Sequence, residues 1–150
     1  MRSYAPNAEV FEASAPPYCG DNKGQLVYDL AEFNAIKFSL CICDFWGTIT
    51  YDIMAELLTR VTGEEWTAEQ MGEIGRRVIN IGRAFNQREG FDRRHDTVPK
   101  RVVTEALQHG PAKGQVIPQE VFDDMLSQYY EVMGWDENGI MPEELVASLL

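Results

Sequence analysis

Cysteine and histidine are scarce in this sequence of 150 residues, which contains only Cys19, Cys41, Cys43, His95 and His109. An odd number of cysteines, in a chain whose first residues carry no apolar core of the signal-peptide kind, argues against a disulfide framework. It indicates free thiols or metal ligands instead. No Cys-x-x-Cys pair occurs, so this chain alone is not expected to supply the four thiolates of an ordinary 4Fe–4S site. Two small buried apolar side chains remain the alternative for Cys41 and Cys43.

Long hydrophobic runs are also missing, and none approaches the roughly 20 residues that span a bilayer. Lys and Arg number 13 against 24 Asp and Glu, which gives a net charge of −11. Nucleic-acid binding depends on Lys and Arg that neutralise phosphates, so an acidic chain argues against it. With 45% apolar and 11% aromatic residues, the sequence is typical of one globular domain. We expect a soluble, cytoplasmic protein with neither a membrane nor a nucleic-acid partner.

Charge is unevenly distributed along the chain. Residues 76–101 contain eight basic and three acidic residues, whereas residues 114–150 contain eight acidic residues and no Lys or Arg. The two segments could pair inside the fold or meet separate partners, and solubility alone would explain the acidic one. For the arginines, ion pairs inside the fold are favoured over the lining of a phosphate site. These arginines are Arg76, Arg77, Arg83, Arg88, Arg93, Arg94 and Arg101.

Apolar residues recur at helical spacing in several stretches, and no convincing run of alternating strands occurs. The sequence therefore predicts an all-α fold, an irregular bundle of about five or six helices. Helices are expected at about 25–40, 50–61, 67–88, 99–107, 118–133 and 142–150. Residues 1–23 contain several prolines and show no helical period, so they predict an extended lead-in. Residues 24–150 are predicted to form the helical domain.

The clearest helical period belongs to residues 67–88, where Thr67 and Gln70 have the spacing of a capping box. The predicted apolar face of this helix comprises Met71, Ile74, Val78, Ile81 and Phe85. Three glycines lower its helix propensity by up to about 1 kcal/mol each, and they suggest close approach of a neighbouring backbone. The glycines are Gly72, Gly75 and Gly82.

A second helix is predicted from an N-cap at Thr50 to a C-terminal stop at Gly63. Its predicted apolar face comprises Ile53, Met54, Leu57, Leu58 and Val61. The apolar run before it, from Phe38 to Trp46, would suit a buried strand or the buried end of a helix. The helix from residue 118 onwards is predicted to place on one face Phe122, Met125, Leu126, Tyr129 and Met133.

Three pieces of sequence are more specific than the charge pattern: FNQREGFDRRHDTVPKR at 85–101, GPAKG at 110–114 and YYEVMGWDENG at 129–139. In order and rough spacing they resemble the C-terminal region of the aldehyde ferredoxin oxidoreductase family, over about residues 24–150. Members of this family are tungsten, sometimes molybdenum, enzymes that carry a bis-pyranopterin cofactor beside one 4Fe–4S cluster. The resemblance implies that the chain is the C-terminal helical domain of such an enzyme.

In this family three cluster cysteines come from an upstream segment, and the fourth comes from a late motif, Asp-x-x-Gly-Leu-Cys, which also contacts the pterin. A gapless reading places the motif on the hexapeptide FSLCIC. The resemblance then implies Cys43 as the fourth cluster ligand, with Cys41 as the rival if the register slips by two residues. Phe38, Ile42 and Asp44 would occupy pterin-contact positions. Phe38 replaces the motif's Asp, and Cys41 replaces its Gly, which normally permits close backbone approach.

Other candidate residues are weaker. His95, in the basic turn, and His109 are expected at the surface rather than as proton shuttles or metal ligands. No nucleophile motif, Gly-rich phosphate loop or zinc-type spacing occurs, and no catalytic residue is assigned to this chain. Packing in the core is expected, rather than stacking on a ligand, for four aromatic side chains. These are Trp66, Tyr129, Tyr130 and Trp135.

The resemblance implies a full enzyme that oxidises an aldehyde to a carboxylic acid and passes two electrons through the cluster to ferredoxin. This domain would cover one side of the tungsten or molybdenum bis-pyranopterin and supply Cys43. Its partners would be the missing upstream domains, and the full enzyme could form a homo-oligomer. Those domains would cover the apolar run from Phe38 to Trp46, so the isolated chain is expected to be marginally stable. The alternative, favoured by the loss of the motif's Asp, is a non-catalytic helical interaction module or split subunit that has lost cofactor binding.

Overall fold

The computed structural model describes residues 22–110 and 113–149. Six helices and no strand occur among these residues, which confirms the predicted all-α fold. They are α2 (Lys23–Ser39), α3 (Tyr51–Thr62), α4 (Ala68–Arg88), α5 (Lys100–Thr104), α6 (Gln119–Met133) and α7 (Glu143–Ala147). The predicted lead-in lies outside the described residues apart from Asn22 and Lys23, where α2 already begins. No helix in the described ranges combines the length and the apolar character needed to cross a bilayer.

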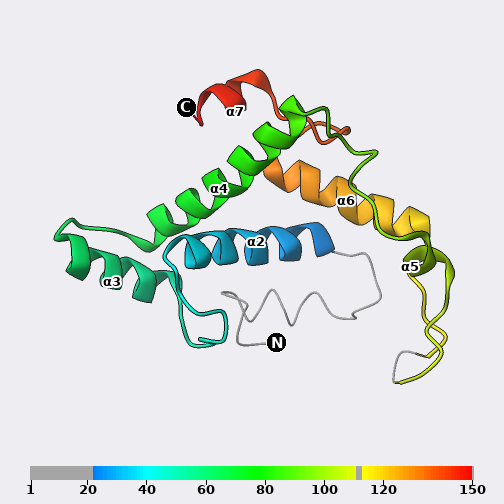
Figure 1. Cartoon of the computed structure of the whole chain (residues 1–150), viewed down its shortest axis with the longest axis horizontal. Helices are drawn as coiled ribbons and strands as arrows, with labels where there is room; N and C mark the ends of the chain where they lie inside the picture. The colour runs from blue at the N-terminus through cyan, green and yellow to red at the C-terminus, as the bar shows by residue number, and fades with distance from the viewer. Residues whose placement is uncertain (1–21, 111–112, 150) are drawn as a thin grey trace.

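Helix α2 lies at the centre of the bundle, with α4 and α6 packed against it and α3 beside the N-terminal part of α4 (Figure 1). The approach of α2 to α4 depends on Gly75, because a Cβ atom there would overlap the backbone carbonyl of Glu32. A Cβ on Gly72 would lie 2.9 Å from the Glu32 carboxylate, whereas Gly82 faces open space. At Gly24, a Cβ would lie 2.5 Å from the backbone of α6. The predicted close approach of a neighbouring backbone is therefore confirmed at Gly75, whereas Gly72 meets a side chain and Gly82 meets nothing.

Local hydrogen bonds fix the ends of α3 and α4. Thr50 Oγ1 accepts from the Ile53 N–H at 3.3 Å, and Gly63 ends α3 with φ +79°. Before α4, the Thr67 hydroxyl accepts from the Gln70 N–H at 3.2 Å, and the Gln70 side chain accepts from the Thr67 N–H at 2.9 Å. The predicted caps are thus confirmed. Each satisfies backbone groups that have no partner inside the helix, and such a cap typically contributes about 1 kcal/mol.

One apolar cluster holds α2, α3 and α4 together. Its buried members are Phe33, Ile36, Ile49, Met54, Ala55 and Met71. Tyr51 packs edge-on against Phe33, with the ring centroids 5.2 Å apart. Full burial of a large apolar side chain contributes about 1.5–3 kcal/mol, so this cluster ties the three helices into one unit.

The apolar face predicted for α4 is only partly buried, and the prediction was wrong for its C-terminal half. Met71 is buried and Ile74 packs against the core cluster, but Val78, Ile81 and Phe85 are exposed. Helix α2 instead approaches α4 on the side where glycine leaves room for its backbone. The buried residues of α4 are Met71, Gly75, Asn80 and Arg83. Hydrophobic periodicity identified the helix, but it carries no information on where a glycine, which has no Cβ, lets two backbones approach.

The face predicted for α3 shows the same difference. Met54 is buried and Leu58 packs against the core cluster, but the other three members are exposed. They are Ile53, Leu57 and Val61. On α6, Met133 is buried, and the remaining members of the predicted face are half-buried.

The shorter helices are shorter than predicted. Helix α5 ends at Thr104, because Leu107 turns away and forms two backbone hydrogen bonds with the following loop. The Leu107 N–H donates to the Gln115 carbonyl at 3.0 Å, and the Leu107 carbonyl accepts from the Gly114 N–H at 2.8 Å. Helix α7 covers five residues rather than the expected nine. Each short helix follows a proline, Pro99 or Pro142, as predicted.

Arginines of the basic segment fasten the acidic C-terminal third to the rest of the fold. Arg77 donates to the Leu149 carbonyl at 2.7 Å. Arg93 donates to the carbonyls of Asp123 at 2.7 Å and Glu137 at 3.1 Å. All three acceptors are backbone carbonyls, so these bonds join the two segments without pairing opposite charges between them. Among the described residues, the carboxylates that pair with arginines of this segment are Asp96, Glu89, Asp92 and Glu105, which lie outside the acidic third. Arginine suits this role because its planar fork presents several donors at once.

Candidate functional site

The candidate ligand Cys43 lies in a tight turn directly after α2. The Cys41 N–H donates to the Phe38 carbonyl at 2.9 Å, and the Ile42 N–H donates to the Lys37 carbonyl at 3.1 Å. Cys41 has φ +56°, in the left-handed region that residues other than Gly rarely adopt. Both thiols of the turn are free and exposed, so the alternative of two buried apolar cysteines is wrong.

Lys37 anchors this turn from inside the protein. Its side chain is 0% exposed, and Nζ lies 2.8 Å from the carbonyl oxygen and 3.1 Å from the carboxylate of Asp44. A buried ammonium group needs such partners, because its charge has lost the solvation of water. The bonds to Asp44 fix the backbone that follows Cys43, so the thiol is carried on an anchored turn. Sequence reasoning missed Lys37, although a lysine within an apolar run and seven residues before an aspartate was a visible signal.

Of the three predicted pterin-contact residues, Phe38 lies at the end of α2, and Ile42 and Asp44 lie in the turn that follows; their side chains do not share one surface. Phe38 is exposed, and Asp44 is exposed although its carboxylate is engaged by Lys37. Ile42 packs against the core cluster, so its side chain faces inwards.

The end of α2 and the turn after it expose aromatic side chains. Phe38, Phe45 and Trp46 are all exposed, with Phe45 at 87%. A buried strand or buried helix end, as first expected for this run, is therefore wrong, because α2 ends at Ser39 and an irregular turn follows. The expectation of an exposed apolar face here is confirmed. Exposed apolar patches of this kind usually mark surfaces that contact another protein segment or a ligand.

These residues fit one ligand position of an iron–sulfur cluster and not a complete site. Among the described residues, no three His, Cys, Asp or Glu side chains lie where they could hold a metal ion together. The exposed thiol of Cys43 could complete a set of thiolates held elsewhere. The fit to a pterin is poorer. Phe38 offers a ring face but no acceptor for pterin N–H groups, and Oδ1 of the Asp44 carboxylate already bonds Lys37.

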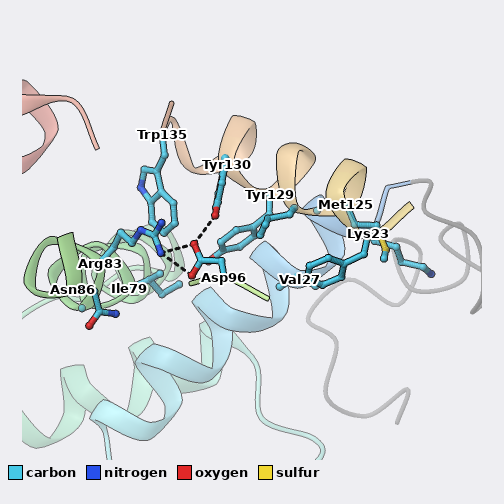
Figure 2. A pocket seen from close by; sticks show the side chains of 14 residues that line it. Lys23, Val27, Ile79, Arg83, Asn86, Asp96, Met125, Tyr129, Tyr130 and Trp135 are labelled. Carbon is cyan, nitrogen blue, oxygen red and sulfur yellow. Dashed lines mark hydrogen bonds and ion pairs between the residues drawn. The ribbon is translucent and has the colours of Figure 1, made fainter. Parts of the chain in front are cut away.

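A groove of about 600 Å³ lies between the start of α2, the C-terminal half of α4 and α6. Figure 2 shows Val27 and Lys23 towards one end of the groove and Arg83 with Trp135 towards the other. Its walls are mostly apolar, with contributions from Val27, Ile79, Phe122, Met125, Leu126, Tyr129 and Trp135.

A network of polar groups lies at one end of this groove, although Arg83 Nη2 has no hydrogen-bond partner in it. Arg83 Nη1 lies 2.7 Å from a carboxylate oxygen of Asp96, and the Tyr130 hydroxyl donates to the same oxygen (Figure 2). Arg83 Nε donates to the Gly139 carbonyl at 2.8 Å, and its guanidinium lies 4.9 Å from the Trp135 ring centroid. Burial and the bond to Asp96 raise the pKa of Tyr130 above its ordinary value, so the phenol remains a donor. The carboxylate is fully engaged, and the network therefore holds the fold together rather than offering a free base.

A second carboxylate, Glu32, lies between two tyrosines on the other side of α2. The hydroxyls of Tyr28 and Tyr51 both donate to it. Burial, together with the bond to Glu32, raises the pKa of Tyr28 to about 12. Burial also raises the pKa of Tyr51 above its ordinary value. This cluster joins α2 to the start of α3.

The remaining candidate residues have structural partners. His95 lies in the exposed turn after α4, where its Nδ1 is 3.2 Å from the Asp92 carboxylate. Hydrogen bonds from Arg94 hold the pKa of Asp92 well below its usual range. Trp135 donates from Nε1 to the Asn80 side chain at 3.0 Å. Surface placement of His95 was predicted and is confirmed. Of the four aromatic residues predicted to pack in the core, Trp66 packs against the core cluster and Tyr130 is buried, but Tyr129, Tyr130 and Trp135 also line the groove.

Comparisons with known proteins agree with one another. The family model "Aldehyde ferredoxin oxidoreductase, domains 2 & 3" matches residues 1–149. The tungsten-containing aldehyde ferredoxin oxidoreductase of Pyrococcus furiosus is 36% identical over 137 residues, which cover 89% of this chain and 22% of the relative. Its counterpart from Pyrococcus abyssi is 32% identical over the same shares. The WOR-like subunit of an aliphatic sulfonate oxidoreductase from Pyrococcus furiosus is 34% identical over 74% of this chain and 19% of the relative. The chain thus spans less than a quarter of the length of these relatives.

Proposed function

Because the chain belongs to the aldehyde ferredoxin oxidoreductase family, we propose that it acts as the C-terminal portion of an enzyme that oxidises an aldehyde to a carboxylic acid. Its relatives carry names for two substrate classes, aldehydes and an aliphatic sulfonate. The aldehyde enzymes match 89% of the chain and the sulfonate-oxidising subunit 74%, which favours the aldehyde. Electrons would leave through a 4Fe–4S cluster to ferredoxin, and Cys43 would be one ligand of that cluster.

The observation that carries the assignment of Cys43 is the backbone at Cys41. The late motif of the family has Gly two residues before its cysteine, and φ +56° is a conformation that Gly adopts readily. The register that places Cys41 on this Gly also places Cys43 on the ligand. A slip by two residues would make Cys41 the ligand and Ser39 the glycine equivalent. Ser39 is the last residue of α2 and lies outside the left-handed region, which supports the first register.

The chain's own residues would position the redox groups rather than perform the chemistry. When bound, the tungsten pterin supplies the oxidation of the substrate and the cluster carries the electrons away. The Cys43 thiolate would hold one edge of the cluster, and Lys37 with Asp44 would keep that thiolate in place. Of the three motif positions, exposed Phe38 would border the pterin as a flat apolar cover in place of a hydrogen-bonding carboxylate, whereas the Ile42 side chain packs inwards and Asp44 bonds Lys37.

A chimaera tests this function directly. Residues 24–149 replace the matching segment of the Pyrococcus furiosus aldehyde enzyme, which then supplies the upstream cysteines. We expect the chimaera to contain iron and sulfide in cluster amounts and to oxidise aldehydes with ferredoxin as acceptor. Cys43→Ala should abolish or strongly reduce cluster content, whereas Cys41→Ala, the matched control from the same turn, should retain it.

Two results would argue for other functions. A chimaera that assembles its cluster equally well with either cysteine replaced would favour the non-catalytic helical module, since neither thiol would then be a ligand. Oxidation of an alkyl sulfonate, with no aldehyde activity, would retain the cluster assignment and move the substrate class to that of the WOR-like relative.

A further inference from the structure

Lys37 is the most deeply buried charged side chain among the described residues. Burial deprives its ammonium group of the solvation of water, and the bonds to Asp44 offset that loss only in part. An apolar side chain of similar volume often serves stability as well as a buried ion pair, or better. Packing and stability alone therefore do not explain a lysine at this position.

The lysine is bonded to both chain neighbours of the candidate ligand Cys43. Before Cys43, the Ile42 N–H donates to the Lys37 carbonyl at 3.1 Å. After Cys43, Lys37 Nζ donates to the Asp44 carbonyl at 2.8 Å. Because consecutive Cα atoms are about 3.8 Å apart, the ammonium lies within roughly 9 Å of the Cys43 Cα atom. A positive charge is thus fixed close to the thiol that would bind the cluster.

The carboxylate of Asp44 does not cancel this charge. Its Oδ1 lies 3.1 Å from Lys37 Nζ, but the Asp44 side chain is 53% exposed and that of Lys37 is 0% exposed. Water screens an exposed charge much more strongly than a buried one. The pair therefore leaves a net positive field inside the turn. Such a field stabilises the more negative, reduced form of a nearby iron–sulfur cluster.

On the basis of the proposed function of Cys43, we propose that Lys37 is a positioning residue whose buried charge raises the reduction potential of the cluster. Reduction adds one electron to the cluster, and the ammonium attracts that added negative charge. This role goes beyond holding the turn. A side chain that only held the thiolate in place would not change the potential according to the sign of its charge.

Potentiometric titration of the chimaera tests this role, with dithionite as the electron donor and the electron paramagnetic resonance of the reduced cluster as the readout. Lys37→Met should shift the potential to a more negative value. Asp44→Asn should shift it to a more positive value, and by less, because the Asp44 carboxylate is exposed. The double variant should lie between the two single variants. Arg60→Met, the control, removes the same charge from an exposed side chain of α3 and should leave the potential unchanged.

Opposite shifts in the two single variants would support the proposal. Shifts in the same direction would show a purely structural role and overturn it, as would an unchanged potential in Lys37→Met. If Lys37→Met fails to retain the cluster, Asp44→Asn decides, and a negative shift or none would overturn the proposal. A wild-type chimaera without a cluster would overturn the proposed function and this inference together. A wild-type cluster whose potential is independent of Lys37 would overturn this inference alone.

Hydrogen exchange in the 150-residue chain tests the positioning without any cluster. The Trp46 N–H donates to the Cys43 carbonyl at 3.1 Å, so its exchange rate reports on the turn. Lys37→Met should raise this rate at least about tenfold, as expected when hydrogen bonds to a charged group are lost. Arg60→Met should leave the rate unchanged. An unchanged rate in Lys37→Met would overturn the positioning role.

Discussion

Removing the Asp96 carboxylate should destabilise the fold strongly, because it is the central acceptor of the groove network. It lies 2.7 Å from Arg83 Nη1 and 2.5 Å from the Tyr130 hydroxyl. Arg83 is 7% exposed, so Asp96→Ala would leave its charge buried with the Gly139 carbonyl as its remaining acceptor. Loss of one partner of a buried ion pair costs about 3–5 kcal/mol. Asp96 itself is 29% exposed, and water can replace part of the bonding, so we expect about 3 kcal/mol.

Urea denaturation followed by far-UV circular dichroism measures this loss. The matched control is Glu56→Ala, which removes the exposed pair between Glu56 and Arg60 on α3. Exposed pairs four residues apart in a helix contribute only about 0.3–0.5 kcal/mol. Asp96→Asn keeps the size of the side chain and one acceptor oxygen, so its loss of stability should lie between those of Asp96→Ala and Glu56→Ala. If Asp96→Ala and Glu56→Ala lower the urea midpoint equally, the network does not stabilise the fold as its geometry implies.

Three further outcomes can be checked by the same denaturation method. Gly139→Ala should cost at least about 2 kcal/mol, since its Cβ would lie 2.7 Å from Tyr130 Cζ; Gly90→Ala, also at positive φ but in open space, should cost less. Cys41→Gly should raise stability by up to about 1 kcal/mol because it relieves a left-handed conformation, and a lowered midpoint would count against this. Burial and the bond to Glu32 raise the pKa of Tyr28 from 10.0 to about 12, so its contribution is complete below pH 10.0 and is lost as pH rises towards 12. Tyr28→Phe should make that alkaline decline shallower, and an unchanged decline would contradict the assignment.

The features predicted correctly from sequence are those set by residues close together in the chain. The capping box of Thr67 with Gln70, the Thr50 cap and the Gly63 stop each depend on side chains within a few residues of the helix end. Helical periodicity likewise located α4. Such signals predict where a helix begins and ends, because the interactions that compete for the unpaired backbone groups at a helix end also come from neighbouring residues.

The features missed from sequence depend on contacts between distant segments. Helix α4 packs through Gly75 because Glu32 of α2 approaches it there, and no periodic pattern of hydrophobicity records that approach. The bond between Tyr130 and Asp96 joins residues 34 apart in sequence. At the candidate site, the family motif drew attention to Cys43, but the buried Lys37 that anchors its turn was found only in three dimensions.

The central claim, that Cys43 is a ligand of the cluster, is tested most directly by the electron paramagnetic resonance of the reduced chimaera. We predict that the reduced 4Fe–4S signal disappears in Cys43→Ala and persists in Cys41→Ala. An undiminished signal in Cys43→Ala would contradict the claim, and its loss in Cys41→Ala alone would move the ligand to the other cysteine of the turn.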